Sequence, residues 1–179
     1  MYDSRIVANF MLDTAKEYDI GLTNLALQKL LFFAHSICLS ERKSALVSGY
    51  FEAWKYGPVH PVVYQAFKSQ GSSVIMDRAM RFDPVTRMTS ELGHLEDRVA
   101  KEICTRVILH FGRLNAGRLV DLTHADGGPW HHVVKNSENG ANIGLRISNE
   151  VIAEKQSRLK ISITPEPISG EPYEDSPLN

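Results

Sequence analysis

One stretch of the sequence, residues 23–40, decides the fold: Thr23-Asn24-Leu25-Ala26-Leu27-Gln28-Lys29-Leu30-Leu31-Phe32-Phe33-Ala34-His35-Ser36-Ile37-Cys38-Leu39-Ser40. Thr23 or Asn24 can cap a helix over about residues 24–40. Apolar side chains cover most of that helix, and four polar ones share what remains: Gln28, Lys29, His35 and Ser36. A helix this apolar is normally surrounded by others. We therefore expect it to be the core of the molecule, centred on Leu27, Leu30, Leu31 and Ala34.

The flanking segments predict further helices. Asp3 or Ser4 can cap a helix over residues 4–18, with Gly21 as its left-handed stop. Residues 46–56 favour a short strand or an irregular segment. Pro58 and Pro61 can both lie in the first turn of a new helix that closes at Gly71.

The second half continues the helical pattern after a break. Residues 72–88 show no stable period, and Asp83-Pro84 marks a turn. We expect the longest helix to begin at Thr89 or Ser90 and to reach about residue 113, with Leu92, Leu95, Val99, Ile103, Val107 and Phe111 facing inward. Shorter helices are expected from Asn115 to near His124, from Pro129 to Val133, and from Ser148 or Asn149 to about Leu159.

These patterns predict a mostly α protein. The chain has 179 residues, of which 43% are hydrophobic, enough for one domain with a proper core. We expect a single compact helical domain over residues 1–160, with at most short β segments. Residues 161–179 are rich in proline and acidic side chains, and we expect a disordered tail.

Charge and hydropathy restrict the partners. The formal net charge is −1, but four acids lie in the tail, so the body carries a small positive excess: Glu166, Glu171, Glu174 and Asp175. So weak an excess makes nucleic acid an unlikely partner and argues against a DNA-binding repressor. The first twenty residues are too acidic for a signal peptide, and no apolar run approaches the roughly 20 residues that span a bilayer. We expect a cytoplasmic protein with Cys38 and Cys104 reduced and buried.

The candidates for metal binding or acid–base catalysis are four residues close together in the sequence: His124, Asp126, His131 and His132. Adjacent histidines on a helix point about 100° apart and do not easily reach one ion, so we predict no metal and no cofactor. His124 and Asp126 are a conceivable acid–base pair of a small hydrolase or transferase. We favour the alternative that they bond backbone groups where one helix ends and the next begins.

Aromatic residues beside glycine and proline form the second feature: Trp54, Tyr56 and Trp130. Such side chains fill gaps between helices at chain turns, or they protrude as anchors of a protein-binding face. The two roles can coexist on one side of the domain.

Three blocks, in this order, resemble the Panacea domain family, which includes SocA-like antitoxins and phage-associated proteins: Leu27–Ala34, Glu52–Tyr64 and Leu119–Trp130. The resemblance covers about residues 5–158. It implies a helical antitoxin domain without catalytic residues. Such a domain neutralises a neighbouring toxin by protein–protein contact, in some members as an adaptor that delivers the toxin to an ATP-dependent protease.

The two aromatic turns predict a set of partner-contact residues; the Gly127-Gly128 and His131-His132 pairs make the loop around Trp130 variable, so contacts there do not follow from the resemblance. We expect a cognate toxin to meet the turns through Trp54, Tyr56, Pro58, His60, His124, Asp126 and Trp130.

Overall fold

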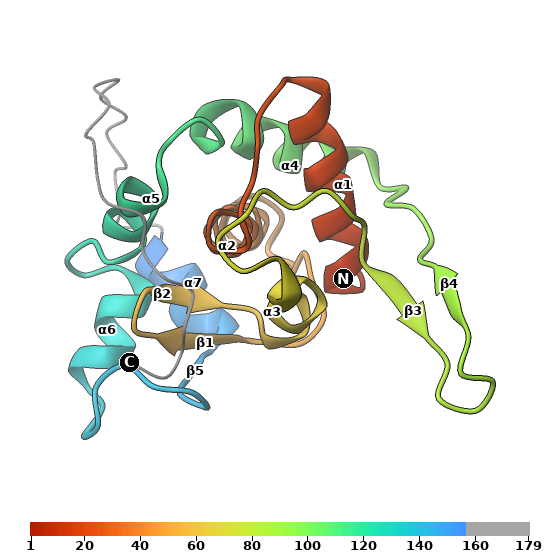
Figure 1. Cartoon of the computed structure of the whole chain (residues 1–179). Helices are drawn as coiled ribbons and strands as arrows, with labels where there is room; N and C mark the ends of the chain where they lie inside the picture. The colour runs from red at the N-terminus through yellow and green to blue at the C-terminus, as the bar shows by residue number, and fades with distance from the viewer. Residues whose placement is uncertain (157–179) are drawn as a thin grey trace.

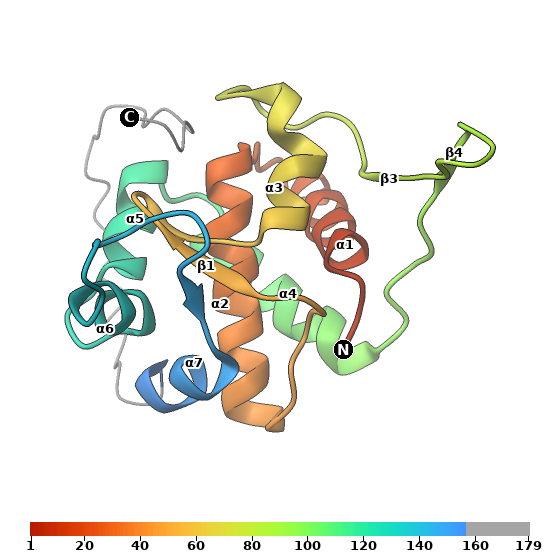
Figure 2. The same cartoon turned by 90° about the horizontal axis from the view of Figure 1, so that it is seen from below.

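A computed structural model of the protein describes residues 1–156, and helix α2 (Asn24–Arg42) runs through its middle (Figures 1 and 2). Five helices pack against α2: α1 (Ser4–Glu17), α3 (Pro61–Phe67), α4 (Arg98–Phe111), α5 (Ala116–Thr123) and α7 (Asn149–Gln156). Helix α6 (Pro129–Lys135) lies against α5 and α7, and a short 3-10 helix, η1 (Lys68–Gln70), follows α3. The predicted mostly α architecture is confirmed. The expected disordered tail, residues 161–179, lies outside the described residues.

Two small antiparallel sheets accompany the helices. The first has the order β2-β1-β5 and joins β2 (Gly57–Val59), β1 (Phe51–Trp54) and β5 (Arg146–Ile147). Trp54 pairs with Gly57, so a two-residue turn, Lys55-Tyr56, connects β1 to β2. The second sheet pairs only β3 (Met80–Phe82) with β4 (Thr89–Glu91), and Figures 1 and 2 show it extending away from the helices.

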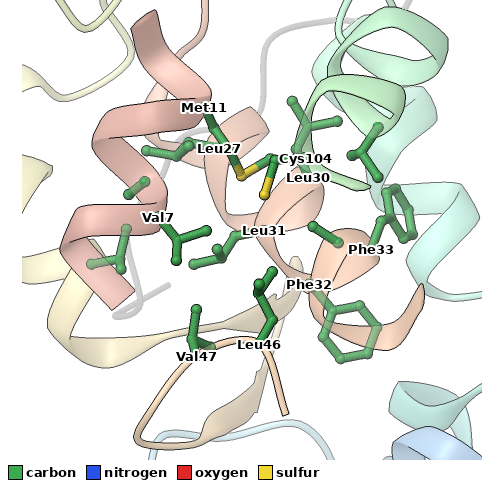
Figure 3. Packing of buried hydrophobic residues seen from close by; sticks show 14 of the residues in the cluster. Val7, Met11, Leu27, Leu30, Leu31, Phe32, Phe33, Leu46, Val47 and Cys104 are labelled. Atoms are coloured by element: carbon green, nitrogen blue, oxygen red, sulfur yellow. The ribbon is translucent and has the colours of Figure 1, made fainter. Parts of the chain in front are cut away.

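The core forms around α2, as its sequence predicts. Fifteen of its 19 residues are buried, and Leu27, Leu30, Leu31 and Ala34 are fully enclosed. Figure 3 shows Leu27, Leu30 and Leu31 facing Val7 and Met11 of α1, with Cys104 of α4 beside them. Cys38 and Cys104 are free thiols, and burial raises the pKa of Cys104 to about 12. Both therefore behave as small apolar side chains.

Local capping signals account for most helix starts. The side chains of Asp3, Thr23 and Asn115 each accept a hydrogen bond from a backbone N–H of the first turn that follows. Pro61 and Pro129 occupy the first turns of α3 and α6, where a missing N–H removes no helical bond.

The expectation of a long helix from residue 89 or 90 to 113 is wrong. Helix α4 begins at Arg98, and residues 89–91 form strand β4. At 1.5 Å per residue its 14 residues span roughly 21 Å. Asp97 is the true cap, because its carboxylate accepts from Ala100 N at 2.8 Å. Leu92 and Leu95 are buried as expected but precede the helix, and Val99 is exposed.

Two smaller expectations also fail. The left-handed residue after α1 is Asp19, with φ 54°, and not Gly21. Pro58 lies in strand β2 and not in a helix, since only Pro61 begins α3. The last helix is described to Gln156, so its predicted end near Leu159 lies beyond the described part of the chain.

Replacement of Asp97 by alanine is expected to destabilise the fold. Asp97 Oδ2 accepts hydrogen bonds from Tyr2 Oη at 2.8 Å and from Arg42 Nη1 at 2.9 Å. The bond from Ala100 N, with help from Tyr2 and Arg42, lowers the pKa of this carboxyl to about 2. We expect Asp97→Ala to lower the midpoint of urea denaturation, because helix α4 loses its N-cap and Tyr2 and Arg42 lose their shared acceptor. Glu96→Ala, at an exposed neighbouring position, is the control and should leave the midpoint nearly unchanged.

Candidate functional site

The three sequence blocks come together where α2 contacts β2 and α5, and the two later blocks continue outward beside α5 and α6 (Figure 1). We call this region the aromatic corner and define it as the β1–β2 turn, residues 54–57, with residues 123–131. Trp130 Nε1 donates a hydrogen bond to Trp54 O at 2.9 Å and so joins the two aromatic turns. The two aromatic turns, whose tryptophans are 76 residues apart in the sequence, therefore lie side by side.

A buried lysine ties the turn to the central helix. Lys29 has no exposed surface, and its Nζ donates a hydrogen bond to Pro58 O at 3.1 Å. Gly57 lies against the same ammonium group. A Cβ added at Gly57 would come within 3.2 Å of Lys29 Nζ and within 2.5 Å of Thr123 Oγ1. The strand, α2 and the end of α5 therefore approach one another so closely that only glycine fits.

Two other polar side chains of α2 form hydrogen bonds with the backbone that follows Pro58. Gln28 Oε1 accepts from His60 N at 2.9 Å, and Asn24 Nδ2 donates to Tyr64 O at 3.2 Å. Gln28 Nε2 in turn donates to Asn24 Oδ1 at 3.0 Å. All of these groups are buried, so each bond replaces one that the backbone would otherwise make to water.

His124 and Trp130 form the outer layer of the corner. Their rings stack with centroids 3.6 Å apart and planes 10° from parallel. Burial lowers the pKa of His124 to about 4, and the charges of Lys29 and His131 add to this effect. His124 Nε2 is buried without a hydrogen-bond partner within the described residues. His124 is therefore a neutral ring at physiological pH, held by stacking.

The structure does not bring His124 and Asp126 together as an acid–base pair. The side chain of Asp126 is fully exposed, and its Oδ1 lies 3.6 Å from Nε2 of His131 instead. His131 Nδ1 accepts a hydrogen bond from Gly127 N at 3.0 Å, which fixes the loop between α5 and α6. Within residues 1–156, no group of three histidine, cysteine or acidic side chains is placed to hold a metal ion.

The other predicted contact residues divide by exposure. His60 is 1% exposed, donates through Nε2 to Ser48 O at 2.9 Å and packs on Phe51. Pro58 is also buried. Trp54 and Tyr56 are half-buried, and Trp54 Nε1 donates to Glu52 Oε2 at 2.7 Å. The corner thus has an outer rim of Trp54, Tyr56, Asp126 and Trp130 over an enclosed base.

Sequence reasoning missed the part played by Lys29 and Gln28. The signal was present, because a lysine and a glutamine on a helix that is apolar nearly all round must be buried with it. Their partners lie 29 to 32 residues away in the chain and carry no local pattern.

The structure defines the class of protein as a small helical domain with an aromatic corner beside α5 and α6. Comparison with known proteins specifies the family. The family described as Antitoxin SocA-like, Panacea domain, matches residues 27–131. Antitoxin SocA of Caulobacter vibrioides (strain NA1000 / CB15N) is 41% identical over 175 residues, which cover 98% of this chain and 93% of that protein. The chain belongs to the SocA-like Panacea family.

No solved structure matches the chain. No helix within residues 1–156 combines the length and the apolar character that a bilayer crossing needs.

Gly57→Ala is expected to be strongly destabilising. Its φ of +96° disfavours a side chain, and the new Cβ would collide with Thr123 Oγ1. Gly127→Ala is the matched control, since Gly127 has φ +75° but open space where a Cβ would lie. We expect thermal unfolding to show that the free energy of unfolding falls by about 1–2 kcal/mol in the control. In Gly57→Ala it should fall by at least ~2 kcal/mol more. Equal losses would show that the close approach to Thr123 does not matter.

The buried histidines are expected to make the fold acid-sensitive. Burial lowers the pKa of His35 to about 4, as it does for His124, from an ordinary value of 6.5. The unfolded chain therefore takes up protons as the pH falls through about 6.5, while the folded chain does so only near pH 4. The contribution of these two neutral histidines to the free energy of unfolding is complete above about pH 6.5, and it is lost between about pH 6.5 and 4. Thermal midpoints should fall across that window. In His124→Phe, which keeps a stacking ring, they should fall less steeply.

Proposed function

We propose that this chain is an antitoxin that neutralises a cognate toxin by binding it directly. The family assignment supports this proposal, and the similarity to Antitoxin SocA extends over nearly the whole of both chains. The 175 aligned residues span the core and the corner alike, which supports a shared scaffold for recognition.

The outer rim of the aromatic corner is one candidate contact surface. Trp54, Tyr56 and Trp130 are half-buried, so each presents part of an aromatic ring that is already fixed in place. Rings of this kind bury a large area at a small cost in conformational entropy. The exposed carboxylate of Asp126 adds a charge at the edge, where it can direct a partner.

We further propose that the chain delivers the bound toxin to an ATP-dependent protease. Such an adaptor must hold two proteins at once and therefore needs two separate surfaces. The corner occupies only the α5–α6 end of the molecule and leaves the opposite end available (Figure 1).

The alternative of a His/Asp hydrolase or transferase has little geometric support. Its acid–base pair is not assembled, because Asp126 is directed to solvent beside His131 and His124 stacks on Trp130.

Neutralisation is tested by co-expressing the chain with the product of the adjacent open reading frame and measuring growth. We expect the unaltered chain to restore growth. His124→Phe should restore it equally, because the stack with Trp130 survives while the imidazole nitrogens are removed. Loss of neutralisation in this variant, with an unchanged thermal midpoint, would instead favour chemistry at the imidazole.

The contribution of the corner is tested with the double variant Tyr56→Ala/Asp126→Ala. Each side chain lies on the rim, so the fold should persist and affinity for the toxin should fall about fivefold or more by calorimetry. Pulse-chase measurement of toxin half-life, with and without ATP-dependent proteases, separates delivery from occlusion. A toxin that is neutralised with an unchanged half-life argues against the adaptor.

A further inference from the structure

Within residues 1–156, one short segment holds nearly half of the exposed large apolar side chains. Among the described residues, thirteen large hydrophobic side chains are exposed, and six of them lie in residues 74–88: Val74, Met76, Met80, Phe82, Val85 and Met88. Val85 is 89% exposed and Met88 68%. Exposed apolar residues that gather in this way mark interaction sites, whereas single ones scattered over a surface do not.

Most of these side chains belong to the β3–β4 hairpin, residues 80–91, which we call the arm. All six residues of its two strands are exposed, and both figures of the whole chain show it projecting from the body. Met80 lies opposite Glu91 and Phe82 opposite Thr89, so Met80 and Phe82 share one face of the hairpin. An isolated two-stranded hairpin is only marginally stable in water, so the arm gains from being covered.

The base of the arm is firmly attached to α1. The buried amide of Asn9 bonds both backbone groups of Ala79, accepting from N at 2.8 Å and donating to O at 2.9 Å. Arg78 forms an ion pair with Asp13. At the two ends of the hairpin, Ala79 and Leu92 are buried in the core. The arm is thus held in position before any partner arrives, which reduces the entropy lost on binding.

The arm carries two arginines and two acids, Asp83 and Glu91, so its formal net charge is zero. The arginines are not paired, however, because Arg81 and Arg87 form no ion pair within residues 1–156. The one acid between them, Asp83, is turned to the backbone, where its Oδ1 accepts from Val85 N at 2.8 Å and Thr86 N at 3.3 Å. A surface of methionine, phenylalanine and arginine has the composition that protein interfaces favour.

A hollow of about 320 Å³ adjoins the base of the arm. It lies between the end of α1 and residues 74–78, with Leu12, Ile20, Val74 and Met76 in its walls. Its lining ends at Arg78, two residues before the arm, so it lies next to the attachment of the arm to α1.

We propose that the arm is the toxin-docking element of this antitoxin, inserting Phe82, Val85 and Met88 into an apolar groove on the toxin that carboxylates border. This inference rests on the proposed function and specifies its surface. The toxin is the occupant because stable neutralisation needs exposed apolar anchors, and the arm supplies more of them than the corner. The arm and the corner lie at opposite ends of the molecule in both whole-chain figures, so the two surfaces can be altered independently and their contributions to toxin affinity compared.

The test compares two double variants that each replace two exposed apolar side chains by glutamine. Phe82→Gln/Met88→Gln alters the arm, and Val62→Gln/Leu109→Gln alters α3 and α4. Both should keep the thermal midpoint of the full chain. The probe is the purified product of the adjacent open reading frame, and affinity is measured by calorimetry. We expect the arm variant to bind at least about tenfold more weakly and the control to bind within about twofold of the unaltered chain.

Charge provides a second measurement. Arg81→Gln should slow association and reduce its dependence on salt, as expected for a residue that steers an acidic partner. Val85→Gln, at the tip of the arm, supplies an independent apolar variant should the double variant fold poorly.

Each outcome bears on one claim. If the unaltered chain and the arm variants bind the toxin with equal affinity, the proposal that the arm docks the toxin is overturned, while direct neutralisation is not. Absence of binding and of neutralisation by the unaltered chain overturns the proposed function, and the arm with it. A dimer that dissociates in the arm variant, with toxin affinity unchanged, shows that the arm contacts a second copy and also overturns the proposal.

Discussion

The fold depends on the polar side chains of α2 that bond the backbone of the segment from β2 to α3. Lys29 donates to Pro58 O, Gln28 accepts from His60 N, and Asn24 donates to Tyr64 O. A strand against the middle of a buried helix has no water for its carbonyl and amide groups, and each unpaired group would cost about 1–3 kcal/mol. These side chains take the place of a neighbouring strand. They allow a three-residue strand to lie within a helical core, and the corner is built on that strand.

Features with a local cause could be predicted from the sequence, and features with a distant partner could not. The start of α1 at Asp3 and of α2 at Thr23 follows from capping, which operates over three or four residues. The start of α4 was misplaced because Thr89, Ser90 and Asp97 all suit a cap by type. Asp97 is the N-cap because Tyr2 and Arg42, far away in the chain, donate hydrogen bonds to its carboxylate. Long-range bonds of this kind leave no periodic pattern.

The same distinction separates the two surfaces. The aromatic turns attract notice in the sequence because Trp, Gly and Pro are rare together, yet their indole N–H groups donate inward, to Glu52 and to Trp54 O. Residue type alone does not tell which side of a turn a ring occupies. Residues 72–88 lacked a period and suggested only the turn at Asp83-Pro84, which lies between strands β3 and β4; nothing local predicted the strands themselves. Exposure, and not residue type, distinguishes the corner that holds the fold together from the arm.

Exposure of the arm carries an energetic implication. At about 25 cal/mol for each Å² of apolar surface, leaving several large side chains in water forfeits a few kcal/mol that burial would supply. The body of the protein does not recover this energy, since Asn9 and the Arg78–Asp13 pair hold only the base of the hairpin. The energy is recovered when a partner covers the arm. Because the base is fixed beforehand, most of the gain is available as affinity and little is spent on ordering the backbone. A domain that uses its helices for rigidity can therefore concentrate its binding energy in about a dozen residues that contribute little to its own stability.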